Sequence, residues 1–389
     1  MGRPVLPAPI TGRACVPVGP PPAEAAAAGT PAPRLARRVG VGRLVLVQLA
    51  VVAVLLAVGS RRPALIIAVT AIALLGLVPL LLRVRGQWYT AVVAARRRLR
   101  RRRQQVQVLA PGFEVTAYEA DGLTIGAGAD DDGWFVAAEV LPPAGRATTV
   151  PLDRLAALLV DGSVPVSAVQ VVTWLVPAPH HLLPPNVACA ESYRQLFAAA
   201  PAAITGRTWV ALRLDDADAV DRTDGTDETA RRVLAGALRR LGRSLTTAGG
   251  GHDVLDPGRL TAAVATCVGL DRGADQPVEN WSTWAAGGLA HAAFEVVRWP
   301  ATATAETLRE LCQVPAAQVV QSIELRRDGA EGAVAVRAAV RLGAAPSRLA
   351  DAAAQLTARA QQAGLRLRRL DGEQAPAGYF CAPTGGSRW

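Results

Sequence analysis

Four aspartates stand close together near the middle of the chain, directly after a segment expected to be a strand. They lie in RLDDADAVD and are Asp215, Asp216, Asp218 and Asp221. Carboxylate oxygens are hard ligands that suit Mg²⁺ or Mn²⁺, and a D-x-D at the end of a strand can hold such a metal together with the diphosphate of a nucleotide sugar. Asp216 and Asp218 are therefore candidate metal ligands of a membrane-anchored glycosyltransferase. The alternative that we prefer is a solvated acidic loop with no metal, because this triplet is common by chance.

No other group of residues has the spacing of a catalytic centre. The glycine-rich segment at 126–133, GAGADDDG, lacks the lysine of a P-loop, and its acids would repel phosphate, so we expect a hairpin turn there. His180 and His181 lie in a proline-rich loop, and His252 and His291 are expected to be structural. G-x-S-x-G and H-E-x-x-H motifs are missing from the sequence. We predict no catalytic residue, no cofactor and no enzyme activity.

Positive charge is concentrated in one segment of the chain. The formal net charge is +10, yet residues 34–103 contain 15 Arg and no acid, whereas residues 104–389 contain 25 Arg against 31 Asp plus Glu. A nucleic-acid-binding protein carries its basic patch on the folded domain. The acidic balance of the larger region therefore argues against nucleic acid as a partner. The five cysteines are scattered without a C-x-x-C pair, which is typical of reduced thiols in a cytosolic compartment.

Two apolar stretches precede the arginine run. Residues 44–60 and 63–82 contain no charged side chain, and a bilayer core of about 30 Å needs about 20 helical residues. Only Arg61 and Arg62 separate the stretches, which predicts a tight transmembrane hairpin within residues 34–86. Buried helices of a soluble core are the alternative, and the absence of a polar face argues against it.

The arginines that flank the hairpin predict its orientation. By the positive-inside rule, both termini lie in the cytoplasm and the chain is a multi-pass protein of the plasma membrane. An Arg-rich juxtamembrane helix is expected at 87–105, with its arginines near anionic lipid headgroups and its first aromatic residues at headgroup depth. The expected membrane-interface residues are Arg61, Arg62, Trp88, Tyr89, Arg96, Arg97, Arg98, Arg100, Arg101, Arg102 and Arg103.

The remaining segments divide into tails and a folded region. Residues 1–33 include nine prolines and are expected to be a disordered Pro/Ala-rich tail. Residues 106–256 and 289–372 can each be read as β-α-β-β-α-β, the split βαβ pattern, and VSAVQVVTWLV in the first resembles AAQVVQSIELR in the second. We therefore expect a cytosolic α+β region with a mixed sheet, built from two related units that are joined by residues 257–288. A C-terminal tail is expected at 373–389. Other α+β chains can be read in this way too, so the relation between the units stays open.

Several of these stretches together resemble the EccE component of actinobacterial type VII (ESX) secretion systems. They are the two spans with their Arg-rich stretch, followed in order by VPVSAVQVVTWLVPAP, RTWVALRLD, WAAGGLAHAAFEVVRWP and LDGEQAP. The resemblance implies a non-enzymatic structural subunit of a membrane complex for protein transport. It also implies EccB, the EccC ATPase and EccD as neighbours. The family supplies no catalytic residues to carry over, and the acidic DDADAVDRTDGTDE segment departs from its pattern.

Overall fold

The structure is a computed structural model that describes most of the chain. The described residues are 35–84, 87–103, 110–142, 150–160, 166–177, 187–199, 205–216, 227–272, 276–300, 311–328 and 333–386. They fall into two compact units, one within Gly19–Gln104 and one within Gln105–Trp389. The tail predicted at 1–33 lies outside the described residues.

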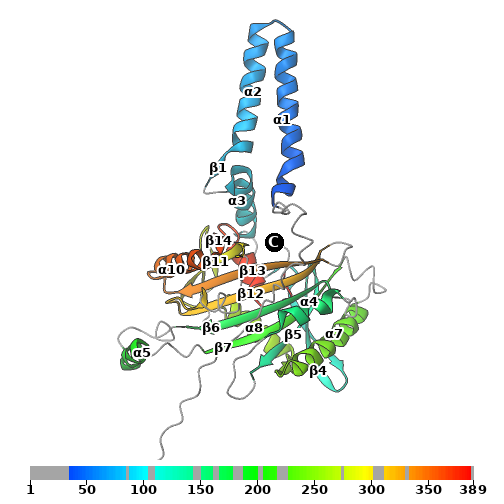
Figure 1. Cartoon of the computed structure of the whole chain (residues 1–389), viewed down its shortest axis with the longest axis vertical. Helices are drawn as coiled ribbons and strands as arrows, with labels where there is room; N and C mark the ends of the chain where they lie inside the picture. The colour runs from blue at the N-terminus through cyan, green and yellow to red at the C-terminus, as the bar shows by residue number, and fades with distance from the viewer. Residues whose placement is uncertain are drawn as a thin grey trace, which may run out of the picture. The chain divides into compact units, whose positions relative to one another are not determined.

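The first unit is a helical hairpin followed by a third helix (Figure 1). Its elements are α1 (Leu35–Gly59), α2 (Pro63–Leu81), β1 (Arg83–Val84), β2 (Gln87–Trp88) and α3 (Tyr89–Arg103). Pro63 occupies the first turn of α2, where its missing N–H costs no hydrogen bond. In the turn before it, Arg61 adopts a left-handed φ of 53°, which helps the chain to reverse within a few residues. Two helices joined by a tight turn are thus present near the predicted positions.

The apolar side chains of α1 and α2 are largely exposed. Leu56 is 71% exposed, Ile67 70% and Leu75 80%. Within the parts of the chain that the structure describes, no helix combines the length and the hydropathy needed to cross a membrane. The helices are therefore observed, while their insertion into a membrane stays a prediction.

The second unit is built on a 12-stranded sheet. Its strands are β3 (Glu114–Ala120), β4 (Leu123–Asp130), β5 (Gly133–Leu141), β6 (Ala168–Val176), β7 (Thr205–Asp215), β8 (Gly251–Val254), β9 (Val278–Glu279), β10 (Trp284–Ala286), β11 (Leu289–Arg298), β12 (Gln318–Asp328), β13 (Ala333–Ala344) and β14 (Arg366–Arg369). The main path runs β3-β4-β5-β7-β6-β12-β13-β11-β10-β9, and β8 and β14 pair with β5 and β11.

The strand order reads the same way in two halves of this sheet. It is β8-β5-β7-β6 in the first half and β14-β11-β13-β12 in the second, and a hairpin (β3-β4 or β9-β10) extends each half. The halves meet edge to edge where β6 pairs with β12, with Val171 opposite Ile323. The result is one continuous sheet in which the second half repeats the connectivity of the first.

The predicted α+β class is confirmed, but the prediction of a mixed sheet is wrong. Every pairing among the described strands is antiparallel. The physical reason is the split pattern itself. A helical crossover makes β5 and β6 run in the same direction, but β7 enters between them and pairs with both in the opposite direction.

Helices cover both faces of the sheet. On one face lie α4 (Leu152–Val160), α7 (Asp227–Thr247) and α10 (Leu349–Gln362), whose apolar residues share one core with the strands. The apolar residues along α7 recur at helical spacing, and among them Leu234, Leu238 and Leu241 are buried. On the other face, α8 (Pro257–Val268) and the residues that end α11 (Gln374–Phe380) form a second core around Trp209. A further helix, α5 (Ala188–Ala199), lies between β6 and β7 in the chain.

Two segments that the sequence suggested to be peripheral contain packed structure. The expected connecting segment, 257–288, contains α8, β9 and β10, and the expected tail from residue 373 contains α11. Phe380, Cys381 and Ala382 are each 0% exposed. The unit boundaries drawn from the sequence stay predictions, but these segments contribute to the core of the sheet unit.

Candidate functional site

The candidate metal ligands of the D-x-D are only partly within the described residues. Asp216 is exposed at the end of β7, while Asp218 and Asp221 lie outside the described part. The pKa of Asp216 is raised, because partial desolvation of its carboxyl and the charges of Asp130 and Asp132 outweigh the lowering effect of Arg213. Among the described residues, no group of three or more His, Cys, Asp or Glu side chains could hold a metal ion. The described chain thus brings together no metal site around Asp216.

The described histidines have structural surroundings. His291 is fully buried, with its ring nitrogens 3.4 Å from the Ala286 carbonyl oxygen and 3.4 Å from Gln318 Nε2. Burial, reinforced by the charge of Arg341, holds the pKa of His291 well below its ordinary value, so the ring is neutral. His252 packs against Gly242 of α7. His180 and His181 lie outside the described residues.

The predicted membrane-interface residues all belong to the hairpin unit. Arg61 and Arg62 form the turn between α1 and α2, Trp88 ends β2 and Tyr89 begins α3. The arginines occupy the last two turns of α3, and its buried residues there are Ala95 and Leu99. Those arginines are Arg96, Arg97, Arg98, Arg100, Arg101, Arg102 and Arg103, all exposed except the half-buried Arg102. Their lipid contacts stay a prediction.

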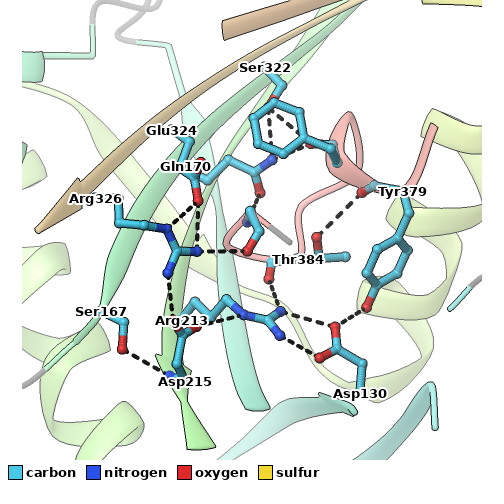
Figure 2. A network of polar contacts seen from close by, with 12 residues as sticks. Asp130, Ser167, Gln170, Arg213, Asp215, Ser322, Glu324, Arg326, Tyr379 and Thr384 are labelled. Atoms are coloured by element: carbon cyan, nitrogen blue, oxygen red, sulfur yellow. Dashed lines mark hydrogen bonds and ion pairs between the residues drawn. The ribbon is translucent and has the colours of Figure 1, made fainter. Parts of the chain in front are cut away.

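A buried polar network that was not expected from the sequence is centred on Arg213 in β7 (Figure 2). Arg213 is 0% exposed, and its guanidinium donates to both oxygens of Asp130, to Asp215 Oδ1 at 3.1 Å and to the Thr384 carbonyl at 3.2 Å. Burial alone lowers the pKa of Arg213, but the hydrogen bonds and charge of Asp130 outweigh it and raise the pKa above its ordinary value. The guanidinium is therefore a permanent buried cation with two carboxylate partners.

Asp215 connects the two halves of the sheet. Its Oδ1 accepts from Arg213 in the first half, and its Oδ2 accepts from Arg326 of β12 at 2.6 Å. Arg326 also donates to Glu324 Oε1 at 2.8 Å and to the carbonyl of Gly386 at 3.3 Å. Both oxygens of Asp215 thus accept hydrogen bonds from arginines.

The same network holds a C-terminal segment, 379–386, across the seam between the halves. Gln170 of β6 donates to Ser322 Oγ of β12 at 2.8 Å and to the Phe380 carbonyl at 2.5 Å, and it accepts the Gly386 N–H at 3.0 Å. Ser322 Oγ donates in turn to the Phe380 carbonyl at 3.0 Å. Tyr379 donates to Asp130 Oδ2 at 2.7 Å. Residues from β4, β6, β7 and β12 therefore all hold this segment in place.

Two glycines allow the segment to lie so close to the sheet. Gly385 and Gly386 have left-handed φ values of 78° and 83°, a region that only glycine adopts freely. A Cβ on Gly385 would overlap Arg213, and a Cβ on Gly386 would overlap the Glu324 carboxylate. Conformation and close packing both require glycine at these positions.

A second buried arginine occupies the equivalent position in the other half. Val171 of β6 and Ile323 of β12 face each other at the seam. Ala168, three residues before Val171, pairs with Arg213 of β7. In the same way Val320, three residues before Ile323, pairs with Arg341 of β13. Arg341 is 1% exposed and donates to the carbonyls of Cys267 and Val268 at the end of α8, at 2.8 Å for Val268. Each half thus supplies a buried arginine that holds the C-terminal segment of the other half.

We call the network around Arg213 the clamp, because its side chains hold residues 379–386 on the sheet. Its carboxylates accept from arginines, and Tyr379 stays protonated because burial and the charge of Asp130 raise its pKa well above the ordinary value. No described member of the network combines an exposed nucleophile with a free base. One sequence signal marks part of it: Arg213 and Asp215 alternate with the leucines of ALRLD, although the same pattern is typical of an exposed strand face.

The fold and the network define an α+β protein with an attached helical hairpin and a buried polar clamp. Residues 202–296 match the family model described as "Putative type VII ESX secretion system translocon, EccE". This match, which spans β7 to most of β11, supports the resemblance of the chain to the EccE component. A comparison with curated proteins found no match.

Proposed function

We propose that the chain is a non-enzymatic structural subunit of a plasma-membrane type VII protein secretion complex. The observation that carries the proposal is the EccE match over residues 202–296. The clamp supports it, because its polar groups hydrogen-bond to one another and to the backbone and so hold the fold. The partners proposed are the other membrane subunits, EccB, the EccC ATPase and EccD, on which the sheet unit docks.

The hairpin is proposed to anchor the chain in the membrane. Its exposed Leu, Val and Ile side chains support this, because water would be an unfavourable environment for two parallel rows of apolar residues. The arginines on the outer flanks of the two apolar stretches, 44–60 and 63–82, favour both termini in the cytoplasm. In this arrangement the arginines of α3 and the aromatic rings of Trp88 and Tyr89 contact anionic headgroups, where each arginine contributes about 1 kcal/mol.

We further propose that the two halves of the sheet are related units. Their shared strand order and the matching positions of Arg213 and Arg341 support a common origin. On this basis the first unit runs from β3 to α8 and the second from β9 to α11, so the joint falls between α8 and β9.

The test of the proposed function is extraction from the native membrane in mild detergent, followed by identification of the co-purifying proteins. We expect the secretion subunits, including the ATPase, to accompany the full chain. A chain that purifies alone would contradict the proposal. Cysteine accessibility measured at the turn residues Arg61 and Arg62, each replaced by Cys, tests the topology independently. Labelling from the cytoplasmic side would contradict the orientation.

A further inference from the structure

The exposed side of α7 forms an arginine-lined groove with β8. The groove has a volume of about 1020 Å³, and its charged lining consists of Arg232, Arg239, Arg240 and Arg243, with His252 at its edge. These arginines recur at helical spacing, so they lie on one face of α7. From Arg232 to Arg243 the row extends over about 16 Å, at 1.5 Å per residue.

The positive charge of this groove is only partly compensated. Arg232 pairs with Glu228 at 3.4 Å and Arg239 with Asp121, and the side chains of both pairs are at least 60% exposed. Exposed pairs of this kind are weak and exchange readily with another anion. Within the described part of the chain, no carboxylate lies within ion-pair distance of Arg240 or Arg243. The groove therefore presents guanidinium groups that can accept an anionic partner.

The packing of the sheet does not require these arginines. The equivalent helix of the second half, α10, buries its apolar residues on the sheet in the same way, yet Arg359 is its only basic residue. The buried stripe of α7 consists of Ala and Leu and a glycine, and none of its arginines belongs to it. The arginine row is thus a surface feature of one half only, added to a helix that would pack without it.

The shape and lining of the groove indicate what it binds. Val233, Gly236 and Ala237 form an apolar floor between the arginines, which favours an occupant with both acidic and apolar side chains. Nucleic acid would gain base stacking from aromatic side chains, and the groove has no Phe, Tyr or Trp in its lining. A row of about 16 Å is also longer than a single phosphate, and it matches roughly five residues of extended chain at about 3.3 Å each.

We propose that the α7 groove binds an acidic segment of a partner protein, with carboxylates on the arginine row and apolar side chains on the floor. The inference rests on the proposed function in that the partner is a protein subunit of the same complex. Arg240 and Arg243 are the residues that provide most of the recognition, because they have no competing carboxylate within the described chain.

The experiment is a titration of the full-length chain in detergent with a fluorescent peptide composed of Asp, Glu, Leu and Ser. The matched probe has Asn and Gln in place of the acids. The groove variant is Arg240→Glu/Arg243→Glu, and the control is Arg359→Glu/Arg366→Glu, which makes the same charge change in the other half. The milder variant Arg240→Gln/Arg243→Gln serves if the charge reversal impairs folding.

We expect the wild type and the control to bind the acidic peptide alike, and the groove variant to bind it at least about tenfold more weakly. Equal affinities in the groove variant and the control would overturn the inference. So would groove-dependent binding of phosphatidylglycerol vesicles or of a single-stranded oligonucleotide without binding of the peptide. The titration tests whether the groove binds an acidic peptide. Co-purification with the wild-type chain tests the proposed function, and its result does not depend on the titration.

Discussion

Arg213 is the residue on which most of the clamp depends. Replacing it with Met removes a guanidinium that is 0% exposed and leaves Asp130 and Asp215 without their shared cation. Because the loss of one partner leaves buried charges uncompensated, we expect the free energy of unfolding to fall by about 3–5 kcal/mol. Urea unfolding of the full chain, followed by tryptophan fluorescence, measures it. Arg240→Met on the surface of α7 is the control, and a similar midpoint for both variants would contradict the assigned role.

Cys312 makes the stability depend on pH. Burial raises the pKa of this thiol to about 12, whereas in an unfolded chain a thiol titrates near about 8.5. The pKa is higher in the folded state than in the unfolded chain. The contribution of the protonated thiol to the free energy of unfolding is therefore complete below about pH 8.5, and it is lost as the pH rises toward the folded-state pKa. Between about pH 9 and 10, the free energy of unfolding of the wild type should fall by up to about 1.4 kcal/mol more than that of Cys312→Ala. Unfolding curves at several pH values test this, with the exposed Cys189→Ala as the variant that keeps the wild-type slope.

At the scale of elements, the C-terminal segment 379–386 depends on its glycines. Gly385→Ala places a Cβ on a residue with a left-handed φ of 78°, and this Cβ overlaps Arg213. Gly122 has nearly the same φ, 77°, but a Cβ there would lie in open space, so Gly122→Ala is the matched control. The backbone penalty is about 1 kcal/mol in each, so Gly385→Ala should be the more destabilising by at least another 1 kcal/mol or so. Thermal unfolding of the two variants compares them directly. Equal losses would indicate that the segment is loosely packed.

The sequence predicted some elements well and others poorly, for reasons that are visible in particular residues. The stripe of apolar residues on α7 repeats at helical spacing, so the helix and its buried face were predictable. In contrast, α11 contains Pro376 and Gly378 within only seven residues, a composition that favours a loop. Its helix becomes understandable only from tertiary contacts, such as the hydrogen bond that the Ala293 N–H donates to Gln374 Oε1. The contacts of the clamp were not predictable, because Asp130, Arg213 and Thr384 are far apart in the chain and meet only through the fold.

At the scale of the whole molecule, the crossed clamps should couple the two halves. Arg341 on β13 donates to the last carbonyls of α8, which belongs to the first half. Arg341→Met should therefore increase hydrogen exchange at the C-terminal turn of α8 more than in α10, which lies closer to β13 in the chain. Exchange measured by mass spectrometry on the full chain checks this. An increase confined to the second half would contradict the coupling.

The position of residues 379–386 at the seam has a consequence for biosynthesis. These residues are made after every strand of the sheet, yet Gln170, Arg213 and Ser322 need them to satisfy their buried polar groups. Until residues 379–386 have been synthesised, the two halves can form but their seam lacks the segment that closes it. A ribosome that stalls before residue 379 therefore leaves an open seam that quality-control proteases can recognise.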